Sequence, residues 1–152
     1  ILLLLDRIIK LIILKSPLRD NGDFMFGLIV PPQINSQLAF SLPLNNNLII
    51  VISGLAIITI IWYFIKLLRQ NSGSALFWGL IIIGALSNFL DRLAVGGVID
   101  YLSLPLIPSL FNFSDAYILL GAVLLLINNC LYLADEKNQT LAGEKETHDS
   151  SK

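Results

Sequence analysis

Residues 48–68 read LIIVISGLAIITIIWYFIKLL and carry no charge before Lys66. A transmembrane helix requires about 20 predominantly apolar residues, and this stretch has that length and composition. Two further stretches qualify, Gly73–Leu90 without any charge and Phe113–Ala134 with none after Asp115. The chain is therefore predicted to contain three clear membrane-spanning helices.

A fourth apolar stretch, residues 1–14, opens the chain in the middle of a hydrophobic run and without methionine. We expect it to be the truncated remainder of another membrane helix, although Asp6, Arg7 and Lys10 lie within it. Four spans place both termini on the same side of the membrane. The predicted fold is an all-α membrane protein with four transmembrane helices.

The composition of the whole chain supports a membrane protein. Hydrophobic residues make up 55%, charged residues only 14%, and the mean hydropathy is +0.77, whereas soluble domains carry about 25% charged residues. The formal net charge of −1 gives no indication of nucleic-acid binding. The single cysteine, Cys130, is interpreted as an inert hydrophobic residue, because one thiol forms neither an internal disulfide nor a metal site.

The segments outside these helices suggest an orientation. Residues 15–47 are rich in Pro, Gly and Asn and contain the apolar runs FMFGLIV and QLAFSLPL, which predict a small β-element between the first two helices. Lys66 and Arg69 mark the next connection as cytoplasmic, because basic residues concentrate on that side. Loops 15–47 and 91–112 then share the extracytoplasmic face. Residues 135–152 are predicted to form a polar, disordered cytoplasmic tail.

Ionisable residues inside membrane segments are costly and need an explanation. Asp6 and Lys10 stand four apart, so they can form a structural ion pair on one helix face or support a nearby active site. Asn88, Asp91 and Arg92 also share a face, at the end of the third helix. They could anchor that helix at the interface, but an amide inside the apolar zone requires hydrogen-bond partners.

Two carboxylates flank the connection that follows. Asp115 lies one turn into the fourth helix behind Asn112, which fits a helix cap. Asp100, in GGVIDYLSL, could be a solvated loop residue. Alternatively, the two form a pair that activates water. Carboxylates that approach closely cannot both ionise, so one serves as general base while its protonated partner polarises a carbonyl.

Other chemistries lack the residues they require. The only histidine, His148, lies in the polar tail, which argues against a Ser–His or Cys–His mechanism and against a multi-histidine metal site. Gly96 and Gly97 alone do not make a phosphate-binding motif. We therefore expect no metal and no cofactor.

Four blocks of the sequence resemble the lipoprotein signal peptidase family, also called signal peptidase II. NFLDRLAVGGVIDY (88–101) is similar to its Asn-x-x-Asp-Arg…Gly-x-Val-x-Asp-aromatic block, and FNFSD (111–115) to its Phe-Asn-x-Ala-Asp block. LDRIIK (5–10) resembles its first-helix Asp…Lys element, and NSQLAFS (35–41) its Asn-x-Gly-Ala-Ala-Phe segment. The blocks occur in the family's order, so the resemblance covers roughly residues 5–134.

The connection from Asp100 to Asp115 is compact, which predicts a short extracytoplasmic lid, and the sequence also departs from the family pattern at two further places. Gln37 and Leu38 replace the Gly-Ala of the outer-loop segment, and Ser114 stands where the family usually has alanine. The first departure concerns loop conformation and substrate contacts, and the second lies beside a position that the resemblance makes catalytic.

The resemblance implies that Asp100 and Asp115 are the catalytic residues of an aspartic endopeptidase domain over residues 1–134. It also implies a polar shell around them, made of Asn35, Asn88, Arg92 and Asn112, with Asp6 and Lys10 as a supporting pair. The enzyme would reside in the bacterial cytoplasmic membrane with its active site toward the extracytoplasmic face. Its expected partners are the bilayer, a diacylglyceryl-modified prolipoprotein cleaved before the lipidated cysteine, and inhibitors of the globomycin type. We expect a monomer.

Two other functions stay open from the residues themselves. A small transporter or proton-relay protein would use Asp6, Asp100 and Asp115 to carry ions, and it predicts polar groups across the membrane depth. The apolar stretches 48–63 and 75–86 offer no such path. A non-catalytic membrane scaffold would use the carboxylates only as caps and solvated loop residues.

Overall fold

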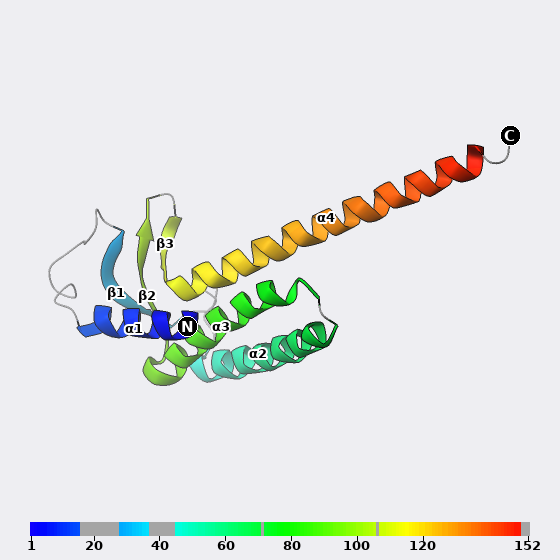
Figure 1. The fold of residues 1–152 in the computed structure, drawn as a ribbon. Coiled ribbons are helices and arrows are strands. Elements are labelled where there is room, and N and C mark those ends of the chain that lie inside the picture. Colours follow the sequence, from blue (N-terminus) through cyan, green and yellow to red (C-terminus); the bar gives the residue numbers. More distant parts are fainter. Residues whose placement is uncertain (16–27, 37–44, 71, 106, 150–152) are drawn as a thin grey trace.

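The computed structural model describes residues 1–15, 28–36, 45–70, 72–105 and 107–149. Within these residues the chain forms four helices and one three-stranded sheet (Figure 1). The elements in chain order are α1 (Leu2–Lys15), β1 (Ile29–Asn35), α2 (Asn46–Arg69), α3 (Ala75–Val95), β2 (Val98–Leu104), β3 (Ile107–Phe111) and α4 (Phe113–Asp149).

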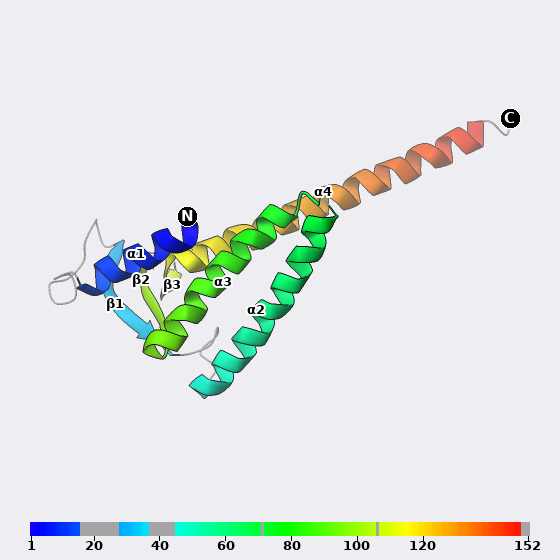
Figure 2. The ribbon, with the colours of Figure 1, turned by 60° about the horizontal axis from the view of Figure 1, so that its bottom comes forward.

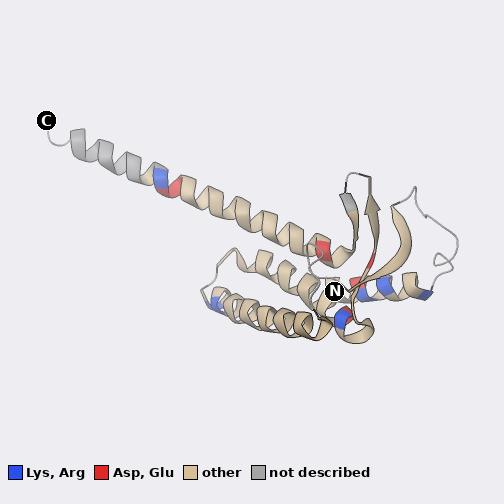
Figure 3. Ribbon diagram, turned by 180° about the vertical axis from the view of Figure 1, so that it is seen from behind, with Lys and Arg blue, Asp and Glu red and all other residues tan. Residues whose placement is uncertain are grey.

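Three helices are long and apolar enough to cross a membrane: α2, α3 and the part of α4 over Phe113–Lys137. Their surfaces expose large apolar side chains, such as Leu55, Ile58 and Leu126 at 61%, 65% and 66%, which suits contact with lipid. Figure 3 shows long uncharged stretches on these helices, with charged residues near their ends. The helix α1 has 14 residues, so the fourth span stays a prediction.

Helix α3 lies between α2 and α4 and packs against both (Figures 1 and 2). Helix α1 contacts α3 and lies beside the sheet, where Ile13 packs with Ile99 and Tyr101 of β2 in a small buried core. This core holds α1 against the central strand, and it thereby brings the charged residues of α1 close to the end of α3.

The end of α3 determines where the sheet lies. Gly96 adopts φ 78°, a left-handed conformation that glycine adopts without a steric penalty, and its N–H donates to Arg92 O at 3.1 Å. The chain therefore leaves the helix and enters β2 at once. The sheet has the antiparallel order β1-β2-β3, with Gln33 opposite Asp100. Asp100 consequently occupies the central strand, next to the helix end.

The sheet corrects the prediction in one respect. Only β1 comes from residues 15–47, whereas β2 and β3 come from residues 91–112, which we expected to be a loop. Asp100 puts a charged residue into the apolar run VIDYLSL, which weakens the local signal for a strand. The strand β2 forms nevertheless, because it pairs with β1 on one side and β3 on the other. FMFGLIV contributes only Ile29 and Val30 to β1, and QLAFSLPL lies outside the described residues.

The polar end of the chain also differs from expectation. Helix α4 continues to Asp149, so the prediction of disorder is wrong for residues 135–149, and residues 150–152 lie outside the described residues. Glu and Lys recur there and favour helix, and extending an existing helix requires no new nucleation. Residues 135–137 are exposed, as the polar composition indicated, but exposure to water does not prevent a helix from continuing.

Candidate active site

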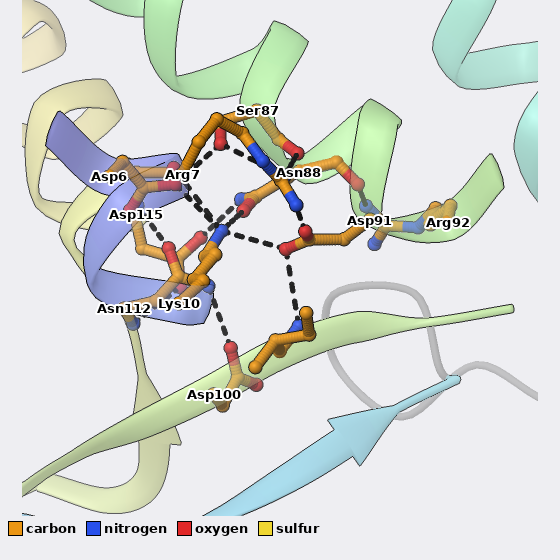
Figure 4. A network of polar contacts seen from close by, with 12 residues as sticks. Asp6, Arg7, Lys10, Ser87, Asn88, Asp91, Arg92, Asp100, Asn112 and Asp115 are labelled. Carbon is orange, nitrogen blue, oxygen red and sulfur yellow. Dashed lines mark hydrogen bonds and ion pairs between the residues drawn. The ribbon is translucent and has the colours of Figure 1, made fainter. Parts of the chain in front are cut away.

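The site lies where the end of α3, the central strand β2 and the start of α4 meet (Figure 4). Asn112 stands between β3 and α4 and is fully buried. Its Oδ1 accepts the N–H of Asp115 at 3.0 Å, and its own N–H donates to Asp115 Oδ2 at 3.1 Å. The predicted helix cap is therefore confirmed, and it is reciprocal.

Asn112 also reaches the second carboxylate. Its Nδ2 donates to Asp100 Oδ1 at 2.8 Å, so one buried amide side chain contacts the two acidic residues from different elements. Asp100 is not a solvated loop residue: it is 3% exposed and belongs to β2. Its other oxygen, Oδ2, accepts from Asn35 Nδ2 of β1 at 3.1 Å.

Asp115 has its own amide partner on α3. Asn88 Nδ2 donates to Asp115 Oδ1 at 2.7 Å. Asn35 makes the equivalent hydrogen bond to Asp100. Three asparagines thus orient two carboxylates by donating to them. The three amides and two carboxylates come from β1, α3, β2, α4 and the residue preceding α4.

Burial has an electrostatic consequence for Asp100. Removal from water raises the pKa of its carboxyl, and the nearby charge of Asp115 acts in the same direction. The amides of Asn35 and Asn112 and the charge of Lys10 oppose this rise. Because burial is the largest cause, Asp100 holds a proton to a higher pH than an exposed aspartate.

The predicted pair of Asp6 and Lys10 is confirmed. Lys10 Nζ lies 2.9 Å from Asp6 Oδ2, and both side chains are fully buried. The ammonium also donates to Asn88 Oδ1 at 3.4 Å, which connects the pair to the site. The two alternatives left open by the sequence, structural pairing and support of the site, are therefore compatible.

Arg92 lies on α3 one turn beyond Asn88, whose carbonyl oxygen accepts from its Nη1 at 3.4 Å. Its charge interacts with those of Asp115 and Asp100 without a hydrogen bond to either among the described contacts. Arg92 thus contributes a positive field beside the carboxylates rather than a direct contact.

Sequence reasoning missed four polar residues around this site. The sequence by itself predicts only an interfacial anchor for Asp91 and no role for Arg7, Ser87 and Ser114. Arg7 and Asp91 form an ion pair, and Ser87 Oγ donates to Asp6 Oδ2. The spacing of Asp91 from Asn88 placed it on the correct helix face, but nothing local indicated that its partners lie on α1.

A cavity of about 380 Å³ opens beside Asp100. It is bounded by residues of all three strands and of the segment after β1, namely Gln33, Ile34, Asn35, Ser36, Asp100, Ser109 and Leu110. Within the described residues, no three or more His, Cys, Asp or Glu side chains are grouped so as to hold a metal ion. The cavity can therefore accept a peptide from the sheet side, next to Asp100.

Comparison with known proteins identifies relatives over most of the chain. A family model described as signal peptidase (SPase) II matches residues 1–131. The lipoprotein signal peptidase of Desulfitobacterium hafniense is 34% identical over 145 residues, covering 89% of this chain and 90% of that protein. That of Halothermothrix orenii is 34% identical over 130 residues, covering 84% and 88%. A solved bacterial membrane enzyme shares the fold, with a TM-score of 0.73 at 23% identity over 90% of this chain and 85% of that one.

Proposed function

Since this chain belongs to the signal peptidase II family of bacterial multi-pass membrane peptidases, we propose that it is an aspartic endopeptidase with Asp100 and Asp115 as its catalytic pair. The observation that carries the proposal is that Asn112 contacts both carboxylates. A scaffold that needed only a helix cap would gain nothing from extending that cap to a buried aspartate on a neighbouring strand.

The substrate is a prolipoprotein that already carries a diacylglyceryl group, and the bond cleaved is the one before the modified cysteine. Such a substrate reaches the enzyme laterally, with its acyl chains in the bilayer. Extracting a lipid costs about 0.8 kcal/mol per methylene, so the reactive groups must meet the peptide at the membrane surface. Asp100 on β2 follows the end of α3, and Asp115 lies in the first turn of α4, so positions near the ends of two apolar helices support this arrangement.

The two carboxyl groups have different roles in hydrolysis, one as general base and the other as general acid. The ionised one removes a proton from water, which attacks the carbonyl carbon of the scissile bond. The protonated one donates a hydrogen bond to the carbonyl oxygen and later a proton to the leaving amine. Asn35 and Asn88 hold the carboxylates in orientation. Arg92 provides positive charge near the oxyanion that develops in the transition state.

The distribution of basic residues supports one orientation in the membrane. Lys66 and Arg69 in the last turn of α2 favour a cytoplasmic position for the connection to α3, because basic residues concentrate on that side. The opposite end of α3, with the sheet and the carboxylate pair, then faces the extracytoplasmic side of the cytoplasmic membrane. Residues 1–134 make up the peptidase domain of a monomeric enzyme, and residues 135–152 form its cytoplasmic tail.

The function is tested by reconstituting the purified chain in nanodiscs with a prolipoprotein. We expect cleavage of the diacylglyceryl-modified substrate and inhibition by globomycin. The matched control substrate carries serine in place of the cysteine, cannot be lipidated, and should remain intact. Failure to cleave the lipidated substrate, or equal cleavage of both, would refute the proposal, and a transporter or a scaffold would produce no cleavage at all.

The pH dependence of cleavage follows from the burial of Asp100. We expect a bell-shaped profile of kcat/KM, because both carboxyls are protonated at low pH and both are ionised at high pH. Because the pKa of Asp100 is raised, the shared proton is lost at a higher pH. Activity should therefore persist well above about pH 4, which is near the usual pKa of aspartate. The two limbs belong to the pair as a unit. A profile that rises through that pH and then stays flat into the alkaline range would contradict a shared proton.

A further inference from the structure

A buried ion cluster lies beside the catalytic pair (Figure 4). We define it by its two carboxylates and two cations, Asp6, Asp91, Arg7 and Lys10. Asp91 lies at the centre: Arg7 Nη1 is 2.5 Å from its Oδ1, and Lys10 Nζ is 2.7 Å from its Oδ2. The carboxylates and cations balance, so the cluster carries no net charge. Three of its four side chains are fully buried, and Arg7 is 24% exposed.

The cluster determines which way the amide of Asn88 points. An ammonium group only donates hydrogen bonds, so the atom of Asn88 that faces Lys10 must be Oδ1. With Oδ1 turned toward Lys10, Nδ2 is turned toward Asp115 and donates to it at 2.7 Å. If Lys10 were displaced, nothing would hold Oδ1 in place, and rotation of the amide would break the hydrogen bond from Nδ2 to Asp115.

Asp91 also reaches the strand that carries the other catalytic residue. The N–H of Ile99, the residue before Asp100, donates to Asp91 Oδ2 at 3.3 Å. One carboxylate therefore connects α1, α3 and β2. Through Lys10 and Asn88 it acts on Asp115, and through Ile99 it acts on Asp100.

We propose that Asp91 is a positioning residue for catalysis: it holds Lys10 against Asn88 and holds β2 against α3, so that the two catalytic carboxylates face the same reacting atoms. The proposal rests on the proposed peptidase function. Asp91 has no hydrogen bond to either catalytic carboxylate among the described contacts, so it acts through its neighbours.

Charge balance makes the proposal testable by a pH profile. The charged and titratable groups around the cluster come from four packed elements: Asp6, Arg7 and Lys10 on α1, Asp91 and Arg92 on α3, Asp100 and Tyr101 on β2, and Asp115 and Tyr117 on α4. Removing one charge from the cluster leaves an excess of the opposite sign beside the pair. A positive excess favours loss of the shared proton, and a negative excess favours its retention.

The experiment compares Asp91→Asn, Lys10→Met and the double variant with the wild type, using the lipidated prolipoprotein in nanodiscs. Each single variant should lower kcat by about 100-fold with KM unchanged, as expected for misplaced catalytic groups. The basic limb of the pH profile of kcat/KM should move to lower pH in Asp91→Asn and to higher pH in Lys10→Met. In the double variant, which is again neutral, the limb should return to its wild-type position. Its kcat should stay near that of the single variants, because both changes release the same amide.

Asp135→Asn and Lys66→Met are matched controls, since they remove the same charges from exposed positions and should leave kcat and both limbs unchanged. The proposal would be overturned if Asp91→Asn kept the wild-type kcat, or if the kcat losses of the two single variants multiplied in the double variant. It would also be overturned if the basic limb of the pH profile did not move in the single variants. If Asp91→Asn does not fold, the neutral double variant decides, and a wild-type kcat there would also overturn it. Failure of the wild type itself to cleave would instead refute the peptidase function.

Discussion

Asp100→Asn and Asp115→Asn should each reduce prolipoprotein cleavage by about 10³-fold or more while the protein stays folded. Asparagine matches the shape of aspartate and retains an oxygen that can accept from Asn112. It cannot take a proton from water, however, and it has no acidic proton to give to the leaving amine. The chemistry should therefore be lost while the packing around each residue is largely retained.

The appropriate measurement is single-turnover cleavage with enzyme in excess, together with the thermal unfolding midpoint of each variant in the same detergent. Asp135→Asn is the matched control, because Asp135 is exposed on the same helix as Asp115 and should retain full activity. Complete cleavage by either catalytic variant would exclude the carboxylate pair. Loss of cleavage with a collapsed unfolding midpoint would show that the residue is needed for folding.

Local sequence patterns predicted the presence of the four helices and the cap at the start of α4. The hydropathy of residues 48–68 identified α2, because an uninterrupted apolar run of that length has few alternatives to a membrane helix. The spacing of Asp6 and Lys10 predicted their ion pair, and Asn112 followed by Asp115 predicted the start of α4. In the ion pair and in the cap, the interacting residues lie within about one helical turn, so the sequence spacing fixes the geometry.

The same reasoning failed where the partners are distant in the sequence. Asp91 pairs with Arg7 and Lys10, more than eighty residues away, and no spacing rule links them. The strand β2 was missed for a related reason. Its short run containing Asp100 is stabilised by pairing with β1 from another part of the chain, which composition does not reveal. The residues that surround the site thus depend on tertiary contacts, whereas the helices that carry them are mostly locally encoded.

Gly84→Ala should disrupt the site from a position on α3 outside the proposed catalytic pair of Asp100 and Asp115. A Cβ at Gly84 would lie 2.3 Å from the carbonyl oxygen of Ser114 and 2.7 Å from Ile118 Cγ1. The first of these atoms belongs to the backbone of α4, so the helices must separate. Small residues permit such close approach of membrane helices. Because Gly84 precedes Asn88 by one turn, the separation should lengthen the 2.7 Å hydrogen bond from Asn88 to Asp115.

We expect kcat to fall by about 100-fold, the cost of an ångström-scale misplacement, and overpacking to destabilise the fold by about 1–3 kcal/mol. Gly79→Ala is the matched control on the same helix, since its Cβ would meet only the ring of Phe64, with Cε2 at 3.8 Å and Cζ at 4.0 Å, which are ordinary contacts. That variant should keep full activity and gain slightly in stability, because alanine favours helix over glycine. Wild-type kcat in Gly84→Ala would mean that α4 can shift without moving Asp115, and the close approach of α3 and α4 would then have no part in building the site.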